Sequence, residues 1–487
     1  MDRISAIDTR RWFLLGLGPG AGWIVFALLR ASMDMEVIPA SIAMLCVWMA
    51  LWWMTEAVPL ELTALLPMLV LPLTGLYKKD AMMEACAPYA HESVYFFLGG
   101  FGLGLAIEKT ELHRRGAMFL LRLAGSNAQV VVGAFMACTA ILSMWMNNTA
   151  TTMLMLPLAT SVIATKSDKR FATSLLIGVA YAASIGGMST LVGTAPNIFF
   201  AGFIKEKGLQ IGFLPWMAFA VPTAIVILTG AWFWMVKILW PMNELRIDIP
   251  TEWVEQWKSR PGWNLHQRVT LLIFAIVAAA WMLRDPLLRL SEGSELQGWL
   301  KVINDPWIAM CSMALLLALP VKDPVLKWSD VERIPWGVLL LFGGGMSLSK
   351  AISVSGLDQH IAQVAGVFGG VPPWLLLVAI VVLVILVSEM ASNLATATTM
   401  LPILMSAAPS LGIDPLMLLS AAVMASSCGF MMPVATPPNT MVFALKRFPV
   451  KDMLLAGLGV NLISVVAIVV LVMWILPLVQ RLSLIHI

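Results

Sequence analysis

Long apolar runs, separated by short polar or charged segments, extend over almost the whole chain. They are long enough to cross about 30 Å of hydrocarbon as helices, and tryptophan often stands near their ends, as it does at membrane interfaces. Bounding each run by its flanking charges or turn residues predicts eleven transmembrane helices, at about 12–29, 37–54, 60–76, 92–108, 171–204, 212–236, 267–284, 306–320, 336–351, 415–446 and 452–477. The pattern therefore predicts an all-α polytopic membrane protein.

Two further apolar segments are too long for one crossing, and each is interrupted midway by polar residues. The first covers about 127–165 and the second about 373–408. Polar breaks in the backbone at membrane depth are costly unless they line a cavity inside the protein. We interpret both segments as re-entrant hairpins, which enter the membrane and leave it on the same side.

The distribution of basic residues supports this topology. With the N-terminus in the cytoplasm and the C-terminus outside, most of the 31 Lys and Arg residues fall on the cytoplasmic side, as expected for membrane proteins. Arg122 and Lys166 flank the first hairpin and then share one side, whereas no Lys or Arg occurs from Ala351 to Leu445, around the second. The two hairpins are thus predicted to point at each other from opposite sides.

Composition restricts the class of protein further. Hydrophobic residues make up 60% of the 487 residues and charged residues only 12%, which excludes a soluble globular chain. The five cysteines are scattered, so neither a disulfide framework nor a metal cluster is indicated. The net charge of +3 is weak and dispersed, which argues against nucleic-acid binding. The membrane is the expected environment of the whole chain.

Three sequence elements occur twice in the same order, about 245 residues apart. Ser143–Pro157 matches Ser388–Pro402, Gly193–Asn197 matches Ala435–Asn439, and Phe97–Gly100 resembles Leu341–Gly344. If each repeat holds an odd number of crossings, the second is inverted relative to the first, as in many secondary transporters.

The repeats suggest a division of the chain into four parts. These are N-terminal spans, mainly of a scaffold, at 1–79; a first repeat at 80–240, with the inner hairpin at 127–165 and a broken helix at 171–204; a cytoplasmic linker at 241–266; and a second repeat at 267–487, with the outer hairpin at 373–408 and a broken helix at 415–446.

Polar side chains gather at the breaks in both hairpins. Asn148 and Thr149 mark the first break, with Ser143 about one turn earlier, and the second half repeats the arrangement with Ser388, Ser392 and Asn393. The N-terminus of a half-helix offers free N–H groups to an anion, and the carbonyls that precede it can coordinate sodium. Each break alone could be an ordinary packing site. Their occurrence at matching positions in both halves favours a binding site.

Acidic residues are rare in the predicted spans, where only Glu56, Glu92, Glu108 and Glu389 occur. A cation transporter or proton pump would more often place carboxylates at its substrate, so a small anion is the favoured cargo. A channel would need a continuous polar pore, which hairpins meeting at the midplane would interrupt. An intramembrane enzyme would need a nucleophile or a metal motif such as His-Glu-x-x-His, which the spans lack. No residue is assigned a catalytic role.

These motifs resemble the divalent anion/sodium symporter family, which contains di- and tricarboxylate and sulfate transporters. The resemblance includes both hairpin breaks and the segments Trp52–Pro59, Phe97–Phe101, Leu112–Arg115, Pro335–Gly345 and Pro433–Asn439. It implies a homodimer in which each protomer has a scaffold domain and a transport domain with two opposed hairpins. It also implies an elevator-type movement and coupling to sodium ions.

The resemblance also implies the residues of the binding sites. One sodium ion is expected at Ser143, the Asn147 backbone, Asn148 and Gly193, and a second at Ser388, Ala391, Asn393 and Ala435. The substrate carboxylates are expected at Asn147, Asn148 and Thr149 and at Ser392 and Asn393, with Thr436 and Pro437 adjacent.

The chain departs from the family's Ser-Asn-Thr tips at two positions. Asn147 replaces the first serine, and Leu394 replaces the second threonine and cannot donate a hydroxyl hydrogen bond. The leading hypothesis is a secondary active transporter in the plasma (bacterial inner) membrane that imports a C4 dicarboxylate such as succinate, fumarate or malate with sodium. Transport of sulfate or citrate, and sodium-independent dicarboxylate exchange, are the alternatives.

Overall fold

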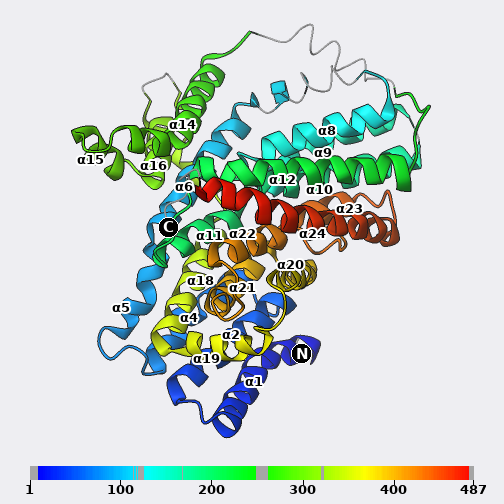
Figure 1. Ribbon diagram of the computed structural model, residues 1–487. Helices are drawn as coiled ribbons and strands as arrows, with labels where there is room; N and C mark the ends of the chain where they lie inside the picture. The colour runs from blue at the N-terminus through cyan, green and yellow to red at the C-terminus, as the bar shows by residue number, and fades with distance from the viewer. Residues whose placement is uncertain are drawn as a thin grey trace, which may run out of the picture. The chain divides into compact units, whose positions relative to one another are not determined.

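The computed structural model describes residues 9–112, 114–116, 118, 125–166, 168–247, 262–319 and 323–481 (Figure 1). Within these residues the secondary structure is helical apart from turns and one isolated bridge between Asn127 and Arg246. The prediction of an all-α multi-pass membrane protein is confirmed. Most of the predicted linker at 241–266 lies outside the described residues.

Eight helices of the described chain are long and apolar enough to cross a membrane. A ninth span results if α15 (Glu295–Val302) and α16 (Asp305–Ala318), which are bent by 68° at their junction, are counted together. These numbers rest on length and composition, and three of the predicted spans, 60–76, 171–204 and 415–446, are divided into shorter helices. The eleven crossings and the re-entrant course of the hairpins therefore stay predictions.

The chain folds as two compact units, which we describe separately. Unit 1 contains Met1–Val94 and Pro335–Ser426, and unit 2 contains Tyr95–Ile334 and Ser427–Ile487. The second predicted hairpin lies in unit 1, and the first predicted hairpin lies in unit 2. The boundaries of the scaffold, the repeats and the linker stay predictions.

Unit 1 is organised around α18. Glycine residues on this helix allow it to pack closely against its neighbours. A Cβ atom on Gly344 would meet the backbone of Ala64, and one on Gly343 would meet the Tyr89 ring. The Tyr89 hydroxyl donates to Ala64 O at 2.5 Å. The helices of this unit are α1 (Thr9–Ser32), α2 (Val37–Thr55), α3 (Leu60–Ala64), α4 (Leu66–Val70), η1 (Leu71–Leu73), α5 (Ala81–Cys86), η2 (Ala87–Ala90), α18 (Trp336–Ser355), α19 (Leu357–Ala365), η4 (Gly366–Phe368), α20 (Pro373–Met390), α21 (Asn393–Ala407) and α22 (Pro415–Ser426).

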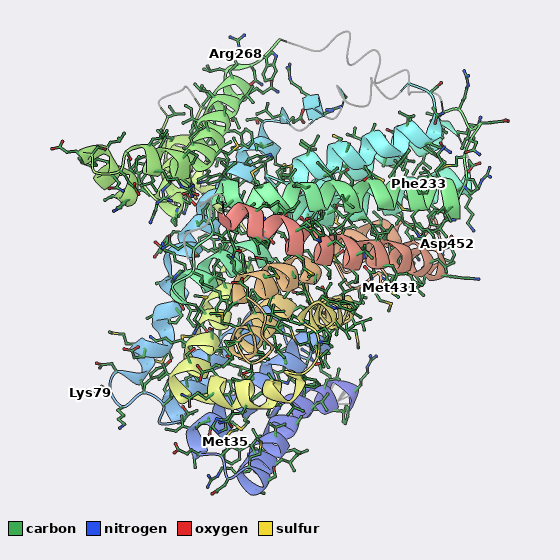
Figure 2. All side chains as sticks on the ribbon, in the orientation of Figure 1. Met35, Lys79, Phe233, Arg268, Met431 and Asp452 are labelled. Atoms are coloured by element: carbon green, nitrogen blue, oxygen red, sulfur yellow. The ribbon has the colours of Figure 1, made fainter. Side chains whose placement is uncertain are left out.

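Unit 2 is organised around α10 (Lys169–Gly187), which is buried from Phe171 to its end. It packs against α8 (Ala128–Ser143), α9 (Asn148–Thr165) and α23 (Pro437–Ala444). The long helices α12 (Phe213–Phe233) and α24 (Val450–Arg481) run side by side, with Phe233 and Asp452 at the same end of the pair (Figure 2). The remaining helices are α6 (Glu92–Lys109, which begins in unit 1), α11 (Ala195–Glu206), the π-helix η3 (Trp234–Leu239), α14 (Leu265–Leu290), α15, α16 and α17 (Trp328–Val331).

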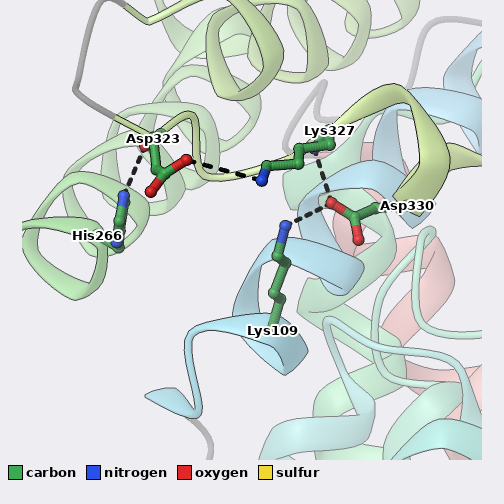
Figure 3. Close-up of polar contacts among 5 residues, drawn as sticks. All are labelled: Lys109, His266, Asp323, Lys327 and Asp330. Carbon is green, nitrogen blue, oxygen red and sulfur yellow. Dashed lines mark hydrogen bonds and ion pairs between the residues drawn. The ribbon is translucent and has the colours of Figure 1, made fainter.

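An ion-pair network joins the C-terminal end of α6 to α17 (Figure 3). Asp330 Oδ2 lies 2.5 Å from Lys109 Nζ and accepts the Lys327 N–H at 2.7 Å. Lys327 Nζ lies 3.6 Å from Asp323 Oδ1. Burial raises the pKa of Asp330, but hydrogen bonds from Lys109 and Lys327 and the charges of Lys109 and Arg333 outweigh it, so the pKa is lowered. The ionised carboxylate therefore stabilises the folded state.

Replacing Asp330 by asparagine is expected to lower the free energy of unfolding by about 1 kcal/mol at pH 7. The folded-state pKa lies below the unfolded value of about 3.9, so the contribution is present above that pH and is lost as pH falls through the folded pKa. Melting temperatures of detergent-purified wild type and Asp330→Asn should differ at pH 7 and converge below about pH 4. Asp323→Asn is the control, because this carboxylate is largely exposed. A difference between wild type and Asp330→Asn that does not shrink as the pH falls below about 4 would assign the effect to packing.

Candidate functional site

The first hairpin break begins where α8 ends at Ser143 and finishes where Asn147 caps α9. Asn147 is extended, with φ −64° and ψ 150°, and its Oδ1 accepts the Ala150 N–H at 2.7 Å. Asparagine is among the strongest N-cap residues because its side chain satisfies an N–H group that the helix leaves free. Thr149, in the first turn of α9, is half-buried. The sequence motif thus starts a half-helix at the position predicted for the tip.

Oxygen atoms of Ser143, Asn148, Ala183 and Gly187 lie close together beside this break. Ser143 Oγ lies 2.9 Å from Asn148 Oδ1 and 2.7 Å from Ala183 O, and its single proton serves one of them at a time. A Cβ atom on Gly193 would lie 2.5 Å from Gly187 O and 2.8 Å from Ser143 O, and one on Gly187 would collide with Asn148 Oδ1. Neutral oxygens that converge in this way are suitable ligands for a small hard cation.

Three residues predicted for the first sodium site, Ser143, Asn148 and Gly193, are therefore brought together in unit 2. Asn147, the fourth, lies between them in the chain and forms the cap. Gly187, whose carbonyl lies beside Gly193, is not among the residues that the sequence predicts for this site. Its match with Gly429, 242 residues later, is the signal that could have identified it.

The second hairpin break, in unit 1, repeats these hydrogen bonds. Ser388 Oγ lies 3.1 Å from Asn393 Oδ1 and 2.5 Å from Ser426 O. Ser392 caps α21, and its Oγ accepts the Ala395 N–H at 3.3 Å. Ala391 is buried and extended between the two half-helices. The structure therefore brings together Ser388, Ala391, Ser392 and Asn393, in the same arrangement as the first break.

Leu394 follows Asn393 in the first turn of α21, and its side chain is 6% exposed. The corresponding position of the first break is Thr149. The two breaks thus share their serine and asparagine contacts but differ by one hydroxyl.

The Pro-containing breaks form two further helix starts, both in unit 2. Thr194 precedes α11, and Thr436 caps α23 by accepting the Asn439 N–H on Oγ1 at 3.3 Å. Ala435 and Thr436 are buried, whereas Pro437 opens α23. Proline is well suited to the first turn because its missing N–H would be unpaired there anyway.

No group of three or more His, Cys, Asp or Glu side chains in the described part of the chain is arranged to hold a metal ion. The breaks offer hydroxyl, amide and backbone oxygens instead. Such donor sets suit alkali cations better than transition metals, which prefer nitrogen and sulfur ligands.

Comparisons with known proteins agree with a transport protein. A citrate transporter family model matches residues 50–423. The sodium-dependent dicarboxylate transporter SdcS of Staphylococcus saprophyticus is 34% identical over 449 residues, which cover 88% of this chain and 85% of the relative. The transporter of the same name from Staphylococcus aureus strain USA300 is 33% identical over 450 residues, with 89% of this chain and 85% of the relative covered.

Two solved transporter structures share the fold at low sequence identity. The Alcanivorax borkumensis YdaH transporter superimposes with a TM-score of 0.58 at 17% identity, covering 96% of this chain and 98% of its own. MtrF of Neisseria gonorrhoeae gives a TM-score of 0.56 at 16% identity and covers 82% of this chain and 85% of its own. Together with the relatives and the matched helix breaks, this evidence shows that the chain belongs to the divalent anion/sodium symporter family.

Proposed function

We propose that this protein is a secondary active transporter that imports a C4 dicarboxylate, such as succinate, fumarate or malate, together with sodium ions. The observation that carries the proposal is the pair of matched breaks, in which Ser143 and Asn148 repeat the contacts of Ser388 and Asn393. The relatives that match most of the chain are named as sodium-dependent dicarboxylate transporters, which supports this choice of cargo and coupling ion.

Each break has donors for an anion and acceptors for a cation. The free N–H groups at the starts of α9 and α21 suit carboxylates, and Asn147, Asn148, Thr149, Ser392 and Asn393 are the substrate residues we propose, with Thr436 and Pro437 adjacent. The proposed sodium ligands are Ser143, Asn147, Asn148 and Gly193 for one ion and Ser388, Ala391, Asn393 and Ala435 for the other. Sodium binding before the dianion would lower the cost of removing the carboxylates from water.

The larger-scale proposals follow from family membership and from the sequence pattern. The transporter works in the plasma membrane as a homodimer, by an elevator-type movement of a transport domain against a scaffold. Its N-terminus is cytoplasmic and its C-terminus is outside, as the distribution of Lys and Arg predicts.

The test of the proposed function is uptake of radiolabelled succinate by proteoliposomes that contain the purified protein. Uptake should depend on an inward sodium gradient and should fall to the level of empty liposomes when sodium is replaced by choline. Unchanged uptake in choline, with stimulation by internal dicarboxylate, would instead establish sodium-independent exchange. The absence of any succinate uptake would reject the cargo.

Citrate is the second candidate, because the family model that matches residues 50–423 is named for citrate transport. Competition distinguishes the two acids. A tenfold excess of unlabelled succinate should suppress uptake of labelled succinate, whereas citrate and sulfate at the same excess should leave most of it. Stronger suppression by citrate would reverse the assignment.

Restoring a hydroxyl group at position 394, where this chain has Leu394, is expected to increase the affinity for the substrate. Leu394→Thr supplies a donor in the first turn of α21, and one added hydrogen bond to a carboxylate should lower the KM for succinate about tenfold to 100-fold. Initial rates at saturating sodium measure the change. Leu394→Val is the matched control, because valine has the shape of threonine without its hydroxyl. Equal KM values for the two variants would show that shape alone matters here.

A further inference from the structure

Two buried asparagines, Asn197 and Asn439, occupy the same place in the two Pro-containing breaks. Each is the third residue of its half-helix, α11 or α23, and they are 0% and 1% exposed. Asn197 Nδ2 lies 2.8 Å from Thr190 O and 3.0 Å from Met188 O, with Gly187 O at 3.5 Å. In each break, the amide group therefore reaches back mainly to carbonyls of the loop that follows the preceding helix.

The second break shows the same contacts 242 residues later. Asn439 Nδ2 lies 3.0 Å from Met432 O and 3.1 Å from Gly429 O, which correspond to Thr190 O and Gly187 O. In both residues the amide oxygen, Oδ1, is buried and has no hydrogen-bond partner in the described structure. An unpaired buried oxygen is energetically unfavourable. The amide oxygen therefore does not explain why an asparagine occupies this position. What Asn197 and Asn439 share is that the NH₂ group of each donates to backbone carbonyls at matching positions of the two loops.

These contacts lead directly to the proposed sodium ligands. Thr190, whose carbonyl accepts from Asn197, accepts the Gly193 N–H on its Oγ1 at 3.1 Å and donates that hydroxyl to Met144 O in the first hairpin break. In the second loop, Met432 O accepts both Asn439 Nδ2 and the Ala435 N–H, the latter at 3.2 Å. Each asparagine is thus one hydrogen-bonded residue away from the carbonyl-bearing residue, Gly193 or Ala435, that we assign to an ion.

We propose that Asn197 and Asn439 are positioning residues, each of which fixes the loop that carries one proposed sodium ligand, Gly193 or Ala435. Asn197 engages Met188 and Thr190 in one loop, and Asn439 engages Gly429 and Met432 in the other. These hydrogen bonds hold each loop, and with it the carbonyl of Gly193 or Ala435, in one conformation. This inference rests on the proposed function. A loop fixed by such hydrogen bonds cannot contract around a smaller ion, so it favours sodium over lithium.

The test measures ion binding without transport. Melting temperatures of the purified protein are recorded during titration with NaCl and with LiCl, and uptake of labelled succinate in proteoliposomes is measured against the concentration of each ion. The variants are Asn197→Ser and Asn439→Ser, with Asn197→Leu, which keeps the branched shape without the amide, as a second variant if serine prevents folding. Thr223→Val is the control, because Thr223 is equally buried but donates within α12, to Phe219 O at 2.7 Å.

We expect each asparagine variant to raise the sodium concentration for half-maximal stabilisation about tenfold, as loss of a residue that supports a metal ligand does. The preference for sodium over lithium should fall at least about threefold, and Thr223→Val should change neither quantity. A lower melting temperature with unchanged sodium affinity and unchanged preference would overturn the inference and leave the asparagines a structural role. If wild-type protein shows neither stabilisation by sodium nor sodium-dependent uptake, the proposed function fails instead.

Discussion

Asn148→Ala is expected to reduce sodium-dependent succinate uptake at least about 100-fold. Asn148 Oδ1 lies 2.9 Å from Ser143 Oγ and would collide with any side chain on Gly187, so it is part of the oxygen cluster beside the first break. Alanine removes a proposed ligand of the cation and a donor near the start of α9 at once. Each lost hydrogen bond to a charged group is worth about 1.5–3 kcal/mol, and two such losses account for the expected factor. Initial uptake rates at equal amounts of reconstituted protein measure it.

Asn127→Ala provides the control for this experiment. Asn127 caps the other end of α8, where its Oδ1 accepts the Gln129 N–H at 3.0 Å. Its loss costs about 1 kcal/mol of stability without touching the break, so uptake should stay within about twofold of wild type. If Asn148→Ala kept more than a third of wild-type uptake, the first break would not be the ion site.

Gly186→Ala is expected to destabilise unit 2 by about 3 kcal/mol and to abolish transport. A Cβ atom on Gly186 would lie 2.5 Å from Ala140 Cα and 2.7 Å from Ala140 C. The obstacle is backbone, so α8 and α10 would have to move apart. Ser143 lies at the end of α8 and Gly187 at the end of α10, and this movement would therefore disperse the oxygens of the first site. Melting temperature and the monodisperse fraction in size-exclusion chromatography report the loss of stability.

Gly178→Ala, on the same helix, is the matched control for Gly186→Ala. A Cβ atom on Gly178 would meet Met136 Cγ and Sδ at 3.1 Å, and a methionine side chain can rotate away. The expected cost is below about 1 kcal/mol, with uptake retained. Equal melting temperatures for the two variants would show that α8 and α10 are not held in contact at Gly186.

The positions of both hairpin breaks could be predicted from the sequence because local chemistry determines them. Asn147 and Ser392 are N-cap residues that follow apolar runs, and the half-helices start directly after them. The predicted span at 60–76 is instead divided into α3, α4 and η1. Pro67 and Pro72 lie in the first turns of α4 and η1, where proline is favourable, and an apolar pattern alone does not distinguish such short helices from one long helix.

The sequence could not place the carbonyl of Gly187 beside the first break, because this contact depends on how two helices pack. The sequence identified Ser143 and Asn148 by their side chains, but the carbonyl of Gly187 joins them only when α10 packs against the break. Asn197 and Asn439 were visible only as members of a repeated motif. Their contacts depend on the conformation of the loop between two half-helices. The spacing of residues in the sequence does not determine that conformation.

The neutrality of the two breaks has an electrical consequence. The side chains proposed to hold the cargo, such as Ser143, Asn148, Ser388 and Asn393, are uncharged. The net charge that crosses the bilayer with them is therefore the charge of the bound ions and acid. A dianion with two sodium ions is then electroneutral, and its uptake would not respond to membrane voltage. Every further sodium ion carried would add a unit of inward current, driven by about 2.3 kcal/mol for each 100 mV of potential. The charge moved per molecule of dicarboxylate taken up, from current and uptake measured together, would therefore give the number of sodium ions.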